Sequence, residues 1–433
     1  MIGARERLAL VEYGAPIDLA GAIVAATGLD RSRAGQILLD AGSRVARSLG
    51  FSSNPLSVEP RGSRAIDFAG LIRLGPSLEL EVAPKFLGVG ADSPWREDFF
   101  FLSTLSRHGR LLATERLSAS GGAPRDLSTL VARSIAGMYE ARKRRPLRSY
   151  RRVSERSFFL DGDPDPVDLV FPDADGFAQD TVKFDRSNAW NATIRAASLA
   201  LIPEVREPGA AAGLMRVAED LAPQAFPAAT RKRIPARHAG WAPLYELSAD
   251  VLEGLGMSYR TGRAHAPGYL VSTWQVWEDL LTIAARLGFG RAAVFPQRGF
   301  TLGSRRKAST EAATTLSVIP DCYVESNGAF PSFLLDAKYK GHVERGLQRM
   351  AEADVYESMA FARAADKRHV VLAYPALPNG PAGPVGTCTA FERIEIGDLR
   401  IIGVQIEARG ISSAGGLRSF ASKIAMQIPA LLD

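Results

Sequence analysis

From residue 266 onward, apolar residues alternate between a helical period and short continuous runs. Trp274–Leu287 has the spacing of an amphipathic helix. Strand-like runs are predicted at Ala292–Phe295, Thr315–Ile319, Ser332–Leu335, His369–Tyr374 and Leu399–Glu407, and further helices at Gln348–Ala364 and Gly415–Leu432. This order is typical of a mixed sheet with helices on its faces. We therefore predict an α/β (mixed α+β) fold for this part of the chain.

The chain has 433 residues, a length that favours two or three domains. Before residue 266, the pattern indicates helices over 17–49 and two strands at Arg64–Leu74 and Ser77–Ala83, followed by largely helical segments. We predict an N-terminal α+β domain over 1–155, a helical middle region over 156–265 and the mixed-sheet domain over 266–433.

Composition narrows the class of protein. The two cysteines, Cys322 and Cys388, fit a reducing cytoplasm and exclude a disulfide scaffold. No apolar run reaches membrane-spanning length, so a cytoplasmic protein without a membrane partner is expected. The net charge of +6 fits a surface for a polyanion, but it also fits a simple arginine bias, since only nine of the 53 basic residues are lysine.

Two carboxylates and a lysine stand out within the predicted sheet. Pro320-Asp321 follows one apolar run, and Asp336-Ala337-Lys338 ends the next. Side chains alternate along a strand, so Asp336 and Lys338 are expected on one face. Mg²⁺, or Mn²⁺ in its place, prefers hard oxygen ligands such as these carboxylates and a backbone carbonyl at Ala337. Such a set suits metal-assisted hydrolysis of a phosphodiester.

Other interpretations of the same residues stay open. Asp321 and Asp336 also fit turn chemistry or surface ion pairs, and Lys338 fits a partner for a neighbouring acid. Glu278, on the helix before the sheet, is a further candidate metal ligand, although a plain solvent-facing glutamate is an equal reading. The scarcity of lysine favours a specific role for Lys338, since an ammonium can orient a water where a guanidinium cannot.

The motifs together resemble the PD-(D/E)xK nuclease superfamily, and more specifically McrC, the nuclease subunit of McrBC modification-dependent restriction systems. The resemblance rests on Pro320-Asp321, on Leu335-Asp336-Ala337-Lys338-Tyr339-Lys340, on the segment Asp354–Ala362, and on Tyr374-Pro375. Trp277-Glu278 stands where the family tends to have Phe-Glu, and Pro84-Lys85 resembles an N-terminal segment of the family. Two positions depart from the pattern: Glu357 replaces a glutamine and Phe361 a tyrosine.

The resemblance implies a Mg²⁺-dependent DNA endonuclease of a prokaryotic restriction or anti-phage defence system. Asp321, Asp336 and Lys338 would be catalytic, and Lys340, Tyr356 and Glu357 would contact or support DNA. The N-terminal domain would bind a separate AAA+ GTPase or ATPase, since this sequence has no phosphate-binding loop of the type Gly-x-x-x-x-Gly-Lys-[Ser/Thr]. Two alternatives remain: a non-catalytic adaptor that stimulates the motor, and a nuclease acting on RNA or recombination intermediates.

Overall fold

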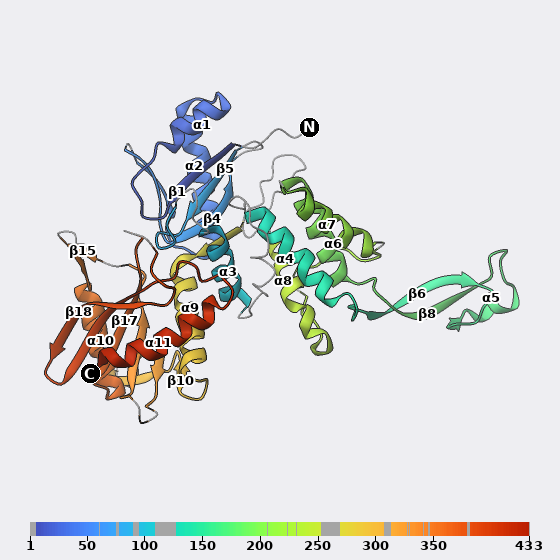
Figure 1. Cartoon of the computed structure of the whole chain (residues 1–433). Coiled ribbons are helices and arrows are strands. Elements are labelled where there is room, and N and C mark those ends of the chain that lie inside the picture. The colour runs from blue at the N-terminus through green and yellow to red at the C-terminus, as the bar shows by residue number, and fades with distance from the viewer. Residues whose placement is uncertain are drawn as a thin grey trace. The chain divides into compact units, whose positions relative to one another are not determined.

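The chain forms two compact units (Figure 1). Unit 1 comprises Met1–Leu127 and Gly268–Asp433, and unit 2 comprises Ser128–Pro267. The computed structural model describes residues 6–59, 61–74, 78–89, 95–108, 127–205, 207–222, 224–230, 232–252, 269–306, 313–326, 328, 330–340, 342–344, 347–378 and 382–432. Unit 1 is therefore discontinuous in sequence.

A four-stranded sheet joins the two segments of unit 1. Its order is β1-β5-β4-β9, from β1 (Glu6–Val11), β5 (Leu78–Ala83), β4 (Phe68–Arg73) and β9 (Tyr269–Ser272). β9 comes from the C-terminal segment and pairs antiparallel with β4, with Leu270 opposite Gly70. All six residues of β5 are buried, as expected of a central strand. The C-terminal segment thus begins inside the N-terminal sheet.

Helices and a hairpin complete the N-terminal part of unit 1. They are α1 (Leu19–Thr27), α2 (Arg31–Leu49), the hairpin β2 (Leu56–Glu59) and β3 (Gly62–Ala65), and α3 (Trp95–His108). α1 and α2 are separated at Gly28, whose φ of 71° ends the first helix in a left-handed conformation that glycine adopts easily. The predicted helical segment over 17–49 is therefore present as two helices.

A second sheet, mixed and six-stranded, forms the C-terminal part of unit 1. Its order is β10-β13-β14-β17-β19-β18, from β10 (Val294–Pro296), β13 (Cys322–Val324), β14 (Phe333–Ala337), β17 (His369–Pro375), β19 (Leu399–Ile406) and β18 (Cys388–Ile396). β14, β17 and β19 run parallel, and the other pairings are antiparallel. Six of the seven residues of β17 are buried, which fits its place in the middle of the sheet.

Helices cover both faces of this sheet, which confirms the predicted fold class. α10 (Glu352–Ala365) packs on one face, where Phe361 joins a core with Leu334, Val370 and other apolar residues. α9 (Thr273–Gly288) and α11 (Gly416–Leu432) pack together on the opposite face (Figure 1). Trp277 of α9 is buried there, and its indole Nε1 donates to the Ala373 carbonyl at 3.0 Å. None of the described helices combines the length and apolarity needed to cross a bilayer.

Three details of this part differ from the sequence-based expectation. The predicted strand Thr315–Ile319 is β12 (Ala313–Val318), but it pairs only with β11 (Phe300–Arg306) in a separate hairpin. The strand beside β14 is instead β13, which is too short to give a periodic signal. The predicted helix at Gln348 begins at Glu352, because Leu347–Arg349 forms β16 and pairs with β15 (His342–Glu344).

Unit 2 combines a helical body with a long β-ribbon. The helices are α4 (Leu127–Arg142), α6 (Ala189–Leu201), η2 (Ile202–Glu204), α7 (Pro208–Asp220), η3 (Ala236–Trp241) and α8 (Ala242–Leu252). The ribbon consists of β6 (Ser149–Ser157) and β8 (Phe177–Asp185), with β7 (Asp163–Pro164) and α5 (Pro166–Val170) at the end far from the helices (Figure 1). The predicted boundary at residue 155 falls within β6, and the segment predicted as helical contains strand β8.

Candidate active site

Three polar side chains lie level with one another across three neighbouring strands. The antiparallel register that pairs Cys322 with Leu335 brings Asp321 opposite Asp336, and the register of β10 brings Gln297 beside Asp321. The Asp321 carboxylate Oδ2 accepts a hydrogen bond from the Ala337 amide at 2.7 Å. Asp336 Oδ1 accepts a longer one from the Asp321 amide at 3.4 Å. The structure therefore brings the two predicted aspartates together.

Lys338 lies on the same face as Asp336, as strand alternation predicts. Its ammonium Nζ is 2.7 Å from Asp336 Oδ2 and 2.6 Å from Glu357 Oε2 on α10, and 3.8 Å from Asp354 Oδ1. Burial alone would lower the pKa of Lys338, but the carboxylates of Asp336 and Glu357 outweigh it and raise the pKa. Lys338 is therefore a firmly protonated cation in this arrangement.

The pKa values of both aspartates are raised. Burial is the main cause for each; Glu278 adds repulsion at Asp321, and Asp321 adds it at Asp336. The resulting pKa is about 6 for Asp321 and about 6 for Asp336. The carboxylate of Asp336 is buried, that of Asp321 is half-buried, and the two lie close together. A cation bound at this site would therefore relieve a substantial electrostatic cost.

Glu278 reaches the same cluster through a residue that the sequence did not reveal. Gln297 Nε2 donates to Glu278 Oε1 at 2.8 Å and to Asp321 Oδ1 at 3.1 Å, so it bridges α9 and β13. Gln297 has a positive φ of 49°, uncommon for a non-glycine residue and a mark of functional or strained positions. Burial, followed by repulsion from Asp279, raises the pKa of Glu278.

The donor set fits a hard divalent cation. The Asp336 Oδ2 atom is buried and has no hydrogen-bond partner among the described residues, apart from its ion pair with Lys338. Among those residues, no three acidic, histidine or cysteine side chains already converge into a metal-holding group. Two carboxylates, with Glu278 nearby, match an ion that takes few protein ligands and keeps several waters. The Ala337 carbonyl stays a predicted ligand.

The remaining predicted site residues have distinct surroundings. Lys340 forms an ion pair with Asp67 at 3.0 Å, and Tyr356 is exposed on α10. Glu357, the first departure from the family pattern, is the ion-pair partner of Lys338. Phe361, the second departure, is only 4% exposed and belongs to the core under α10, so it does not face a substrate.

N-terminal residues hold the segment that follows Lys338. The buried Glu12, just after β1, accepts hydrogen bonds from the Tyr339 hydroxyl and from Thr273 Oγ1. Lys85 Nζ donates to the Tyr339 carbonyl and lies 4.1 Å from the centroid of the Tyr339 ring. The sequence signalled Lys85 only through its resemblance to a family segment, and gave no signal for Glu12.

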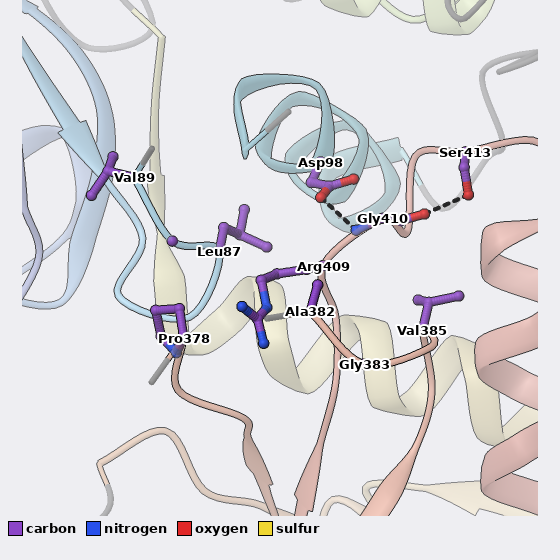
Figure 2. A pocket seen from close by; sticks show the side chains of 11 residues that line it. Leu87, Val89, Asp98, Pro378, Ala382, Gly383, Val385, Arg409, Gly410 and Ser413 are labelled. Carbon is purple, nitrogen blue, oxygen red and sulfur yellow. Dashed lines mark hydrogen bonds between the residues drawn. The ribbon is translucent and has the colours of Figure 1, made fainter. Parts of the chain in front are cut away.

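One cavity lies away from this chemistry. Its volume is about 590 Å³, and it is lined by residues that include Leu87, Asp98, Pro378 and Arg409. Figure 2 shows Asp98 accepting a hydrogen bond from the Gly410 amide, at 2.7 Å. Arg409 pairs with Glu407 at 2.5 Å. The Asp98 carboxylate thus joins α3 to the loop after β19, and the cavity lies at this junction within unit 1.

Comparison with known proteins agrees with the geometry. A family model described as "McrBC 5-methylcytosine restriction system component" matches residues 63–375, well over half of the chain. The chain belongs to this family. The match covers β4, β5 and β9 of the N-terminal sheet and the Asp321–Asp336–Lys338 cluster, and it confirms the resemblance predicted from the sequence. A search of curated proteins found no match.

Two solved structures are similar in fold. One is a refined half-complex from a tetradecameric assembly of Thermococcus gammatolerans McrB AAA+ hexamers with bound McrC; the similarity has a TM-score of 0.63 at 15% identity and covers 98% of this chain and 100% of that chain. The other is a cryo-EM structure of the Thermococcus gammatolerans McrBC complex, with a TM-score of 0.46 at 13% identity, covering 64% of this chain and 86% of that chain. At this identity, the first similarity establishes the fold alone.

Proposed function

We propose that this restriction-system component is a Mg²⁺-dependent DNA endonuclease that works with a separate AAA+ NTPase. The observation that carries the proposal is the cluster of Asp321, Asp336 and Lys338 at one end of neighbouring strands, with an ammonium 2.7 Å from a buried carboxylate. Family membership supports a role in restriction. The assignment of DNA as substrate follows from that membership.

Each residue of the cluster has a distinct role in this proposal. Asp321 and Asp336 would hold Mg²⁺, and Glu278 is a further candidate ligand. Gln297 would keep the carboxylates of Glu278 and Asp321 in place through its hydrogen bonds to both. When bound, Mg²⁺ neutralises phosphoryl charge and lowers the pKa of water. Lys338, being protonated, would stabilise negative charge on the phosphate or orient the attacking water through its N–H groups, rather than remove a proton.

Substitutions of Asp336 and Lys338 test the catalytic proposal. Asp336→Asn and Lys338→Met should each lower the rate of plasmid cleavage by at least about 100-fold, as expected for loss of an electrostatic catalytic group. Asp398→Asn, which removes a carboxylate from an exposed ion pair with Arg368, is the matched control and should cleave at the wild-type rate. Unchanged cleavage in Asp336→Asn would refute the proposal.

The same variants distinguish the nuclease proposal from the alternative of a non-catalytic adaptor. Its specific support is that Lys338 is already engaged by Asp336 and Glu357, as a structural ion pair would be. An adaptor would stimulate the NTPase of its partner without cutting DNA, so Asp336→Asn would keep full activity in protecting cells against phage. A nuclease loses that protection together with cleavage.

The partner proposal draws on the solved complex and on unit 2. In the similar structure, McrC is bound to McrB AAA+ hexamers. Here the β6–β8 ribbon and its tip expose many large apolar side chains, namely Tyr150, Phe158, Phe159, Leu160, Val167, Val170, Phe171, Val182 and Phe184. Exposed apolar surfaces of this kind mark interaction sites. We therefore propose that the AAA+ contact lies on this ribbon, most of which is outside the N-terminal domain (1–155) to which the sequence-based expectation assigned it.

Co-purification tests the partner proposal. The chain would be expressed with the AAA+ protein encoded nearest to it, and the complex isolated by size exclusion with nucleotide present. Replacing Phe158, Phe159 and Phe171 by serine should abolish the complex, while the helical content of the whole protein, measured by circular dichroism, stays at the wild-type value. A complex of wild-type stability would place the contact elsewhere.

A further inference from the structure

A second cavity, of about 500 Å³, lies beside the proposed catalytic cluster. It opens beyond the carboxyl ends of β14 and β17, since it is lined by Tyr339 and Lys340, which follow Lys338, and by Tyr374 at the end of β17. The Tyr374 hydroxyl donates to Asp354 at 3.0 Å, and Asp354 lies 3.8 Å from the Lys338 ammonium. Crevices at the carboxyl ends of parallel strands are common ligand sites.

Backbone strain is concentrated at the rim of this cavity. Tyr13 and Asp67 both have positive φ, 57° and 61°, and their side chains are hydrogen-bonded to each other. Asp67 also holds Lys340 at 3.0 Å. Among the described residues, only two other non-glycine positions have positive φ: Gln297, within the catalytic cluster, and Asp366, which ends α10. Strain of this kind persists where the surrounding structure holds a residue for a purpose.

The cavity combines a fixed positive charge with a polar acceptor. The Lys85 ammonium is held between the rings of Tyr339 and Tyr13, at 4.1 and 4.9 Å from their centroids. Lys340 adds a second ammonium at the rim, on a side chain that is 65% exposed. Gln348 Oε1 is buried and has no hydrogen-bond partner among the described residues. A buried acceptor without a partner is costly unless a ligand completes it.

The remaining wall is apolar and aromatic. Tyr13, a residue that is 39% exposed, lines the cavity together with Pro375, Leu377 and Pro378. Flat apolar walls suit an aromatic ring, and ammonium groups suit a phosphate. The volume lies in the range of small-ligand pockets, which fits a single ligand-sized unit and not a duplex.

We propose that this cavity binds one unpaired nucleotide unit, an aromatic base joined to a phosphate, beside the cleavage site. The base lies against Tyr13 and Leu377, with its amino group toward Gln348, and the phosphate lies near Lys340 and Lys85. The nucleotide belongs either to the bound nucleic-acid strand or to a free nucleotide, since both carry the same chemistry. The inference rests on the proposed function for its place beside a scissile phosphate, but the binding itself is independent of cleavage.

Binding measured without divalent metal tests this proposal. The probes are a fluorescein-labelled 12-nucleotide single strand and the same strand with abasic sugars, titrated with full-length protein in chelator. Tyr13→Ala and Leu377→Trp, which fills the cavity, are the base-site variants. Lys340→Gln removes the rim cation. Lys143→Gln is the matched control, since Lys143 is also an exposed lysine in one ion pair, with Glu140.

The expected pattern separates base from phosphate recognition. Tyr13→Ala and Leu377→Trp should weaken binding of the normal strand by about 5- to 100-fold, the range of one stacked base, and leave the abasic strand unaffected. Lys340→Gln should weaken both strands and reduce the salt slope by about 0.7. Lys143→Gln should change neither.

Two further measurements are needed. One distinguishes a free nucleotide from a nucleotide of the bound strand, and the other distinguishes failure of this proposal from failure of the proposed nuclease function. Competition by deoxycytidine monophosphate at micromolar concentration would assign the cavity to a free nucleotide, and its absence, with the base effect present, to the strand. Wild-type affinity for the normal strand in both Tyr13→Ala and Leu377→Trp would overturn the proposal, even if the protein cuts DNA. Absence of cleavage by the wild-type protein with its AAA+ partner and Mg²⁺ present, with the base effect intact, would instead refute the proposed nuclease function and leave the nucleotide site standing.

Discussion

Glu12→Gln should make the stability of unit 1 less dependent on pH. Glu12 is fully buried, and burial, partly offset by hydrogen bonds from Thr273 and Tyr339, raises its pKa from 4.5 to about 7. A raised pKa means that the folded chain binds the proton more tightly than the unfolded chain does. The stabilisation is therefore complete below pH 4.5 and is lost as pH rises through 7.

The magnitude follows from the shift. A change from 4.5 to about 7 corresponds to roughly 3 kcal/mol of stability lost between pH 4.5 and pH 8. Glutamine cannot ionise, so the difference in stability between Glu12→Gln and the wild type should move by roughly that amount in favour of the variant over the same range. Other titrating groups cancel, because the two proteins are compared at each pH.

Urea unfolding followed by tryptophan fluorescence measures this difference at pH 5, 6, 7 and 8. Tyr339→Phe provides a matched test, because the Tyr339 hydroxyl stabilises the ionised form of Glu12 and its loss should enlarge the pH dependence. A stability difference between Glu12→Gln and the wild type that stays constant with pH would refute the reasoning.

Three other outcomes are expected. Lys85→Met should lower kcat/KM about 10-fold, since Lys85 positions the backbone after Lys338 and lines the proposed nucleotide site, and Lys85→Arg should restore part of it in steady-state cleavage assays. Phe361→Ala should cost about 3–5 kcal/mol in urea unfolding, because it empties a core site, and a cost below 1 kcal/mol would contradict its burial. Mg²⁺ affinity, measured by calorimetry, should fall below about pH 6 as Asp321 and Asp336 take up protons, and affinity unchanged at pH 5 would contradict their raised pKa.

The sequence predicted the parts of this molecule that depend on local pattern. The alternation in Asp336-Ala337-Lys338 was enough to place both side chains on one face, and the apolar runs gave β14, β17 and β19. Three-residue strands such as β13 carry no period, so the neighbour of β14 was assigned to Thr315–Ile319 instead. The sequence pattern did not predict the roles of Gln297 and Glu12, because these roles arise from contacts between residues that are 24 and 327 positions apart in the sequence, respectively.

The discontinuity of unit 1 has a practical consequence for experiments on fragments. A polypeptide starting near residue 266 would carry β9 without β4, leaving an unpaired strand edge that favours aggregation. It would also lose Glu12 and Lys85, and with them the hydrogen bonds that hold Tyr339. Inactivity of such a fragment would therefore reflect its incomplete sheet, and would not show that the chain lacks catalytic residues. Residues 128–267, in contrast, enter and leave unit 1 as a single insertion, so exchanging them leaves the sheets of unit 1 uninterrupted and tests the AAA+ contact proposed for the β6–β8 ribbon.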